Sequence, residues 1–379
     1  MTRELRFSAL AAPGVQALQP YVPGKPMAEL EREYGISNSL KLASNENPLG
    51  PSATVLAAMQ AAMKEVRLYP DGSGHALKLL LAERHGVVPE QITLGNGSND
   101  VLVLLAEAFL AAGLEAVYDQ HAFVVYALAV QAVGAIARIA PSLPAEHASQ
   151  PLGHDPEAIK AAYGPRTRLV YIANPNNPTG TWLDEAALRG LLNALPADAL
   201  LVLDEAYAEY VTEPAYPDSE KLLAEYPNLV ITRSFSKAFG LAGLRIGYSV
   251  SHAAVAELLN RVRQPFNTNS IAQAAALAAL ADTDFLVQSR AMNQAGLAQL
   301  QQGLADQGFA VPDSLGNFVL LDLARPAGPV YEALLRAGII VRPVASYGLP
   351  NHLRISVGLP EQNARLLSAL PRCLAEATG

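Results

Sequence analysis

An α/β architecture with a mainly parallel sheet, and a smaller α+β domain beside it, is expected for this chain of 379 residues. The length suits two packed domains. Half of the chain is hydrophobic (51%) and only 16% is charged, so it can bury a large core. Apolar runs of strand length alternate with helical segments up to about residue 262, as in βα units. After Pro265 the sequence pattern changes: an Ala-rich helix is followed by shorter strand candidates.

The elements of the larger part follow from local signals. Helices are expected where apolar or amphipathic segments follow a capping residue or a glycine: 52–66, 74–85, 100–112, 184–194 and 253–262. Strands are expected at short apolar runs: 92–94, 168–173, 200–203, 229–232 and 245–250. These strands and helices form the expected large domain, residues 45–265.

The C-terminal part, residues 266–379, is expected to form the small domain. An Ala-rich helix at 271–281 leads into a long Gln-rich helix, and strand candidates follow at 318–323, 339–341 and 353–357. The first forty or so residues carry prolines at 13, 20, 23 and 26, which favours an arm over a core element. Residues 1–44 are therefore expected to form that arm and part of the small domain.

Charge and cysteine content narrow the possible partners. Lys plus Arg is 27 and Asp plus Glu is 35, which gives a net charge of −8, and no dense basic stretch occurs, so no nucleic-acid partner is expected. The single cysteine, Cys373, excludes an internal disulfide and a cysteine metal cage and fits a reducing compartment. No targeting or membrane segment is evident, because the apolar run 101–112 is short and contains Glu107. We expect a cytoplasmic protein without a metal site.

The strongest chemical signal is the segment Ser234-Phe235-Ser236-Lys237, with Arg245 eight residues after the lysine. Desolvation of a lysine at the end of a buried strand favours its neutral amine. A neutral amine can form a Schiff base with an aldehyde. The two hydroxyls and the arginine can hold a phosphate beside that amine. Taken alone, the segment fits a surface lysine in a polar turn equally well.

A second signal is an aspartate with a tyrosine three residues later. Asp204 ends the apolar run 200–203, and Tyr207 follows it. Ligands of open α/β sheets bind beyond the carboxyl ends of the strands. A carboxylate there can keep a pyridinium nitrogen protonated, and the tyrosine can donate to a phenolic oxygen. A helix-capping aspartate beside a packed tyrosine is the alternative.

Three further segments are weaker signals when taken singly. The turn 174–180, Asn-Pro-Asn-Asn-Pro-Thr-Gly, holds an asparagine amide in place after a buried strand. The junction Gly95-Asn96-Gly97-Ser98-Asn99 lets helix N-terminal amides approach an anion, although Asp100 stands where the dinucleotide fingerprint requires glycine. Arg354 on an expected strand can grip a carboxylate in a bidentate manner. A plain loop or a surface arginine explains each one alone.

Together these motifs resemble those of the fold-type I aminotransferases that use pyridoxal phosphate. Three segments narrow the resemblance to the histidinol-phosphate aminotransferases, which are class II members of that group: residues 42–51 (LASNENPLGP), 69–71 (YPD) and 236–239 (SKAF). The resemblance extends from about Leu18 to the C-terminal helix. It implies a large domain with a mainly parallel seven-stranded sheet between helices, a smaller α+β domain, and a homodimer with shared active sites.

The resemblance also implies roles for individual residues. Lys237 would carry the Schiff base and move the proton, Asp204 would pair with the pyridinium nitrogen, and Tyr207 would bond the phenolic oxygen, which makes these three the catalytic residues. Further cofactor-binding positions are Ser98, Asn99, Phe123, Asn177, Ser234, Ser236, Arg245 and, from the neighbouring subunit, Tyr69. Positions that would bind the substrate are Tyr21, Asn45, Arg342 and Arg354.

The implied reaction transfers the amino group of histidinol phosphate to 2-oxoglutarate and gives imidazole-acetol phosphate and glutamate, a step of histidine biosynthesis. An aromatic amino-acid aminotransferase of the same fold would keep the cofactor residues and Arg354 without needing Arg342. A non-catalytic regulator that binds pyridoxal phosphate is the remote alternative. The segment 120–126, Gln-His-Ala-Phe-Val-Val-Tyr, lacks the proline and first tyrosine of the family pattern. Phe123 would still stack on the cofactor there, and His121 is a second candidate base.

Overall fold

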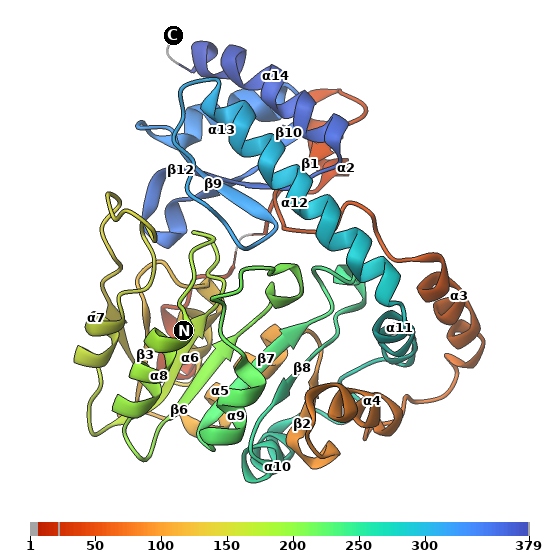
Figure 1. The fold of residues 1–379 in the computed structure, drawn as a ribbon, viewed down its shortest axis with the longest axis vertical. Coiled ribbons are helices and arrows are strands. Elements are labelled where there is room, and N and C mark those ends of the chain that lie inside the picture. Colours follow the sequence, from red (N-terminus) through yellow and green to blue (C-terminus); the bar gives the residue numbers. More distant parts are fainter. Residues whose placement is uncertain (1–6, 22, 378–379) are drawn as a thin grey trace, which may run out of the picture.

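The computed structural model describes residues 7–21 and 23–377, which form two stacked bodies (Figure 1). The lower body is built on the larger sheet and the upper body on a smaller one. The long helix α12 (Thr283–Ala305) runs from one body into the other. The expected division into a large α/β part and a smaller α+β part describes this arrangement.

Within the described residues, the large sheet has seven strands, and the expected mainly parallel sheet is confirmed. In spatial order the strands are β2 (Ile92–Gly95), β8 (Gly247–Val250), β7 (Leu229–Ser234), β6 (Leu200–Asp204), β5 (Thr167–Ala173), β3 (Glu115–Asp119) and β4 (Ile136–Ala140). Strand β8 runs antiparallel to both neighbours, and the other pairs are parallel. The sequence did not predict β3 and β4 individually, because Glu115 and Asp119 at the ends of β3 leave only a short apolar run between them and Arg138 interrupts the run of β4.

Helices cover both faces of this sheet, as the near-continuous apolar strands require. They are α3 (Ala53–Ala62), α4 (His75–His85), α5 (Ser98–Phe109), α6 (Val124–Ala132), α7 (Pro156–Ala161), α8 (Glu185–Ala194), α9 (Ser219–Glu225), α10 (Ala253–Val262) and α11 (Ser270–Ala281). Side chains that alternate along a strand enter different cores. On β5, Val170 and Ile172 join one apolar cluster, whereas Leu169 and Tyr171 join the other.

The upper body contains two small sheets. Strands β11 (Arg342–Val344), β12 (Leu349–Ser356) and β9 (Phe318–Asp322) form an antiparallel sheet in that order, and β1 (Leu40–Lys41) pairs in parallel with β10 (Ile339–Ile340). Helices α2 (Met27–Tyr34), α13 (Ala327–Arg336) and α14 (Pro360–Glu376) complete this body. Buried leucine, isoleucine and valine side chains from most of these elements form its core, and Leu30 of α2 lies in a separate small cluster with Leu335 and Ile340.

Residues 40–47 connect the two bodies. The backbone amide of Leu42 donates to Ile340 in the upper body at 2.7 Å. A few residues later, the Asn47 side chain donates to the Ala238 carbonyl in the lower body at 2.9 Å. The chain therefore crosses from one body to the other at this short segment.

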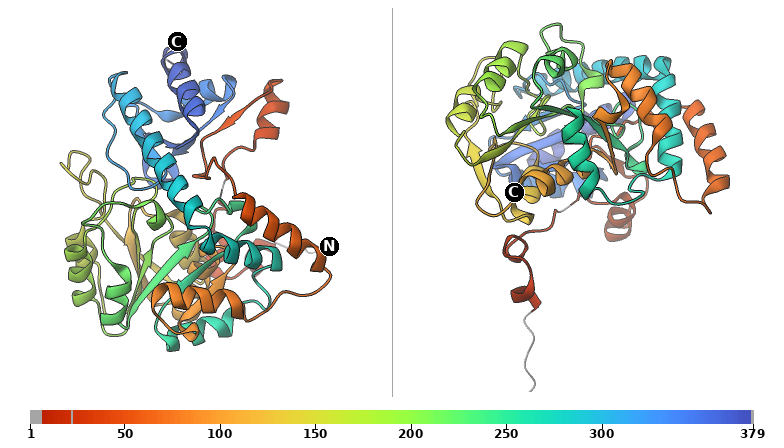
Figure 2. Two further views of the ribbon diagram at one scale, coloured as in Figure 1. Left: turned by 45° about the vertical axis from the view of Figure 1, so that its right-hand side comes forward. Right: turned by 90° about the horizontal axis from the view of Figure 1, so that it is seen from below.

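The ends of the chain add short elements. The N-terminal arm contains η1 (Phe7–Leu10) and α1 (Pro13–Gln16), of which α1 contacts α6, and the arm projects below the body in the right-hand view (Figure 2). The remaining 3-10 turns are η2 (Met63–Glu65), η3 (Pro89–Gln91), η4 (Ala208–Tyr210), η5 (Ala242–Leu244) and η6 (Ala345–Tyr347). Across the described ranges, no single helix is long and apolar enough to cross a membrane, and one bent pair, α11 with α12, passes that test only when taken together.

Helix α11 belongs with the large sheet by its packing. Ala272, Ala275 and Ala276 lie in the same apolar cluster as strands β5 and β6, and α11 packs against α3. The expected division at residues 265/266 had assigned this helix to the small domain. We propose that the division falls at α12 instead, since its C-terminal half contributes Leu300 and Leu304 to the upper core.

Candidate active site

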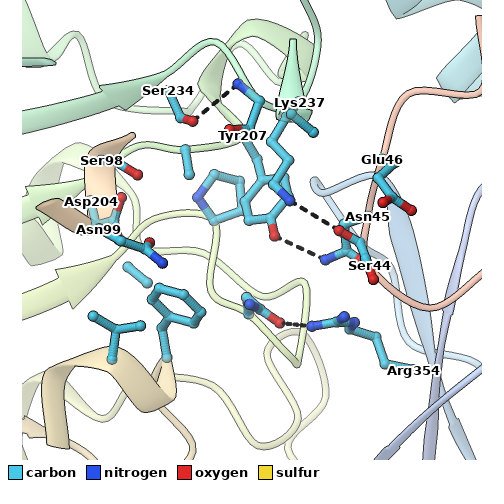
Figure 3. Close-up of a pocket in the computed structure, with 18 of the residues that line it drawn as sticks. Ser44, Asn45, Glu46, Ser98, Asn99, Asp204, Tyr207, Ser234, Lys237 and Arg354 are labelled. Carbon is cyan, nitrogen blue, oxygen red and sulfur yellow. Dashed lines mark hydrogen bonds between the residues drawn. The ribbon is translucent and has the colours of Figure 1, made fainter. Parts of the chain in front are cut away.

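A cavity of about 380 Å³ lies where the carboxyl ends of β5, β6 and β7 face the small domain (Figure 3). Parallel register brings Ala173, Asp204 and Thr232 side by side at this edge. Most of the residues that the sequence singled out line the cavity: Tyr21, Asn45, Ser98, Asn99, Phe123, Asn177, Asp204, Tyr207, Ser234, Ser236, Lys237, Arg245 and Arg354. The fold thus gathers segments that are more than 300 residues apart in the sequence.

The Lys237 amine points into the cavity just beyond the end of β7. Its Nζ donates to the Ser44 carbonyl oxygen at 3.1 Å and lies 5.7 Å from the centre of the Tyr207 ring. Burial is the larger cause and the positive charge of Arg354 the next, and together they lower the pKa of Lys237 to about 7. The amine is therefore available as a nucleophile and base near neutral pH.

Asp204 lies at the opposite wall and is 4% exposed. Tyr126 Oη donates to its Oδ2 at 2.8 Å, and Thr232 Oγ1 donates to its Oδ1 at 3.0 Å. Burial raises the pKa of the Asp204 carboxyl, and these two hydrogen bonds act against that rise. A carboxylate held in this way favours a cationic partner placed against it.

Tyr207 is held by a chain of hydrogen bonds. Asn45 Nδ2 donates to the Tyr207 hydroxyl at 2.9 Å, and Ser356 Oγ donates to Asn45 Oδ1 at 2.8 Å. Burial raises the pKa of Tyr207 to about 12, so its hydroxyl keeps its proton and can donate. Asn45 has a positive φ of 55°, which asparagine tolerates better than most residues.

An anion cradle lies beside the lysine. Arg245 Nη1 donates to Ser236 Oγ at 3.1 Å, and the amide of Ser236 donates to Ser234 Oγ at 3.1 Å. Helix α5 begins at Ser98, so its first amides face the same space. Gly97, with φ of 86°, lets the arginine approach, since a Cβ there would lie 2.3 Å from Arg245 Nη2. These donors suit a phosphate.

Arg354 reaches the cavity from β12 and is 6% exposed. Its Nη1 donates to Asn177 Oδ1 at 2.5 Å, and its Nη2 donates to the Ala43 carbonyl at 2.6 Å. Within the described residues its Nε has no hydrogen-bond partner. A buried guanidinium with a spare donor is suited to a carboxylate or a phosphate.

Two expected residues lie outside the cavity lining. Tyr69 is 83% exposed and stacks on Phe266, with ring centroids 4.8 Å apart. Arg342 lies on β11 opposite Arg354 on β12, and its guanidinium lies 5.3 Å from the centre of the Tyr21 ring. Tyr21 lines the cavity, so Arg342 is one aromatic ring away from it.

His121, the second candidate base, is placed otherwise. It is 4% exposed and does not line the cavity. Its Nδ1 lies 2.6 Å from the Tyr347 carbonyl oxygen, and its Nε2 lies 2.9 Å from Gln120 Nε2. A carbonyl oxygen only accepts, so Nδ1 carries a proton and serves as a structural donor.

Sequence patterns missed several residues of the site. Tyr126 and Thr232 hold Asp204, and Glu46 and Tyr347 line the cavity. Thr232 had a usable signal, because it stands beside Asp204 in the register of two neighbouring parallel strands. Glu46 is part of a motif already singled out and pairs with Lys41 at 2.7 Å. Tyr347 had none, since it reaches the cavity from a turn of the small domain.

Comparison with known proteins agrees with this geometry. Residues 37–370 match the family model described as aminotransferase class I and II. Histidinol-phosphate aminotransferase 2 of Pseudomonas fluorescens is 56% identical over 98% of this chain and 99% of its own length. The protein of the same name from Pseudomonas aeruginosa is 56% identical over 97% and 99%.

Solved structures show the same fold. The crystal structure of histidinol-phosphate aminotransferase from Sinorhizobium meliloti, in complex with pyridoxal-5'-phosphate, has a TM-score of 0.88 and 32% identity, with 99% of both chains covered. A Thermus thermophilus aspartate aminotransferase double mutant has a TM-score of 0.82 and 26% identity, with 98% of this chain and 100% of that chain covered. On these matches, the chain belongs to the aminotransferase class I and II family and groups there with the histidinol-phosphate aminotransferases.

Proposed function

We propose that this protein transfers the amino group of histidinol phosphate to 2-oxoglutarate, with pyridoxal phosphate held at Lys237. One observation carries the proposal: an amine with a pKa lowered to about 7 shares one cavity with a buried carboxylate and an anion cradle. Relatives that are 56% identical over nearly the whole chain and are named histidinol-phosphate aminotransferases support the choice of reaction.

The residues present fit the cofactor. Arg245, Ser234 and Ser236, with the first amides of α5, would hold its phosphate, and Asp204 would pair with its ring nitrogen. Asn177 and Tyr207 would hydrogen-bond its phenolic oxygen, and Phe123 would cover one face of its ring. When bound, pyridoxal phosphate supplies an aldehyde for the amine and a ring that withdraws electrons from the substrate α-carbon.

The chain itself supplies proton transfer and orientation. The Lys237 amine, neutral above about pH 7, would take the proton from the substrate α-carbon and return it at the cofactor C4′ atom. Arg354 would bind the α-carboxylate of glutamate with its spare donor. In histidinol phosphate that carboxylate is replaced by a phosphorylated carbinol, so Arg354, with Arg342 and Tyr21 nearby, would meet a phosphate instead.

The test is an amino-donor panel with the purified protein. Histidinol phosphate, phenylalanine and tyrosine are each offered with 2-oxoglutarate, and glutamate formation is measured. Preference for histidinol phosphate supports the proposal, and preference for phenylalanine or tyrosine would assign the aromatic reaction instead. Lys237→Ala should lower turnover about 10²- to 10⁴-fold relative to the natural protein. Normal turnover in that variant, or none in the natural protein, would end the proposal.

We further propose a homodimer in the cytoplasm with sites shared between subunits. The exposed, stacked ring of Tyr69, away from the cavity of its own chain, supports its donation to the partner's phosphate cradle. Mixed dimers of Lys237→Ala and Tyr69→Phe chains test this. If sites are shared, one of the two sites in a mixed dimer carries both changes and the other carries neither. Activity should then recover relative to either parent variant, and no recovery would contradict sharing.

A further inference from the structure

Two buried side chains face each other behind the wall of the cavity. Asp119 ends β3 and is 1% exposed, and His154, just before α7, is 2% exposed. His154 Nδ1 lies 3.5 Å from Asp119 Oδ2. Among the described residues neither atom has a hydrogen-bond partner. Since buried polar atoms are rarely left unsatisfied, we take each of these two atoms to be the polar partner of the other.

The surrounding hydrogen bonds locate the protons. His154 Nε2 lies 2.9 Å from the Ala173 carbonyl oxygen, which only accepts, so Nε2 carries a proton. Asp119 Oδ1 accepts from the His121 amide and from Ser142 Oγ, each at 2.7 Å. Two donors favour the ionised carboxylate. If Nδ1 carried no proton, its lone pair would face a carboxylate oxygen and the two would repel each other. We therefore infer that Nδ1 is protonated as well.

The pair joins the two segments that shape one side of the cavity. Asp119 precedes the loop to Phe123, which is the residue before α6, and it holds that loop through the His121 amide. Ala173 lines the cavity, ends β5 and leads into the turn that carries Asn177. His154 therefore connects the Phe123 segment to the Asn177 segment from behind.

We propose that His154 is a buried imidazolium ion whose pairing with the Asp119 carboxylate positions Phe123 and Asn177 around the cofactor. His154 is a positioning residue, because it lies behind the cavity wall and touches it only through the Ala173 backbone. The positioning effect rests on the proposed function, because it concerns residues around the cofactor. The charge of His154 does not, and it can be measured with or without cofactor or substrate.

The first experiment measures that charge. Protein labelled with ¹⁵N at histidine is studied by NMR with and without pyridoxal phosphate, and the His154 signals are assigned by their loss in His154→Gln. Both ring nitrogens should carry protons. In Asp119→Asn the new amide keeps an acceptor for the two donors and offers Nδ2–H to His154, so Nδ1 should lose its proton. A bare nitrogen on His154 in the natural protein would overturn the proposal.

The second experiment measures cofactor binding and orientation. Asp119→Ala and His154→Gln should raise the dissociation constant of pyridoxal phosphate about tenfold or more, and misplacement of the ring should lower kcat by up to about 100-fold. The circular dichroism of the bound cofactor should weaken in parallel. Asp119→Asn, with its neutral hydrogen bond, should stay within about threefold of the natural protein, as a conservative replacement that rescues positioning.

The matched control is His85→Gln. His85 is also buried, at 6% exposure, and its ring nitrogens bond Glu220 and Tyr248 at 2.9 Å each, but it does not line the cavity. Its loss should leave cofactor affinity unchanged. Natural affinity in both Asp119→Ala and His154→Gln, or an equal loss in His85→Gln, would refute positioning. Failure of the natural protein to bind pyridoxal phosphate would instead refute the proposed function, with the NMR result still standing.

Discussion

The lowered pKa of Lys237 predicts how fast the cofactor-free protein captures an aldehyde at each pH. The pKa of this amine is about 7 against an ordinary 10.5. At pH 7 such an amine is neutral in about half of the molecules, whereas an ordinary lysine is neutral in about one of 3,000. Only the neutral amine attacks an aldehyde. Capture at pH 7 should therefore exceed that of a solvent-exposed lysine by about three orders of magnitude.

The sign of the pH dependence follows from the same values. Because the reactive form is deprotonated, the rate should rise with pH, be half-maximal near pH 7 and level off by about pH 8 to 9, instead of climbing to pH 10.5. Arg354→Gln removes the nearby charge that most lowers the pKa, so its midpoint should move upward. Burial, the larger cause, remains in that variant and should keep the midpoint below the ordinary value.

Stopped-flow absorbance of the cofactor-free protein mixed with pyridoxal phosphate measures this rate. Borohydride fixation and peptide mass then verify that the label is on Lys237. Pyridoxal without phosphate is the control, because the phosphate itself ionises near pH 6. A midpoint near 10.5 in the natural protein, or a midpoint that does not move in Arg354→Gln, would refute the electrostatic reasoning.

Three other changes give separable outcomes. Asp204→Asn should lower the single-turnover rate about 100- to 1000-fold, because an amide cannot hold the ring nitrogen protonated, and a natural rate would refute that role. Gly97→Ala should weaken cofactor affinity in an equilibrium titration because its Cβ would lie 2.3 Å from Arg245 Nη2, whereas Gly113→Ala, with φ of 87° but open space, should lower only the melting temperature. Arg342→Ala should reduce kcat/KM for histidinol phosphate far more than for phenylalanine, and equal losses would favour the aromatic reaction.

The sequence predicted that the residues at the strand ends meet at one place, because the signals for that placement are local. Asp204 and Lys237 each follow a buried apolar run, and the parallel sheet places the ends of such runs at one edge. The motif positions therefore predicted the meeting point without any knowledge of long-range packing. Family membership, which the comparisons confirm, fixed the cofactor class in the same way.

What the sequence could not predict depends on contacts between distant segments. Tyr126 supports Asp204 from α6, and nothing in its own neighbourhood signals a hydroxyl aimed at a carboxylate 78 residues away. The expected domain boundary assigns α11 by a change in composition, which does not say which apolar face an alanine-rich helix packs on; in the structure this helix packs on α3. The sequence offers His121 as a candidate base in a loop, but its Nδ1 donates to the backbone carbonyl of Tyr347.

The segment 40–47, where the chain crosses between the two bodies, is sensitive to the relative position of those bodies. At one end, β1 pairs with a strand of the upper body. At the other end, Asn47 donates a hydrogen bond to the Ala238 carbonyl of the lower body. Between them, the Ser44 carbonyl accepts from Lys237, and Asn45 donates to Tyr207. A rotation of the upper body relative to the lower one would therefore disturb the contacts of Lys237 and Tyr207 together. The rate of amide hydrogen exchange at residues 40–47 would thus measure how often the contacts between the two bodies open.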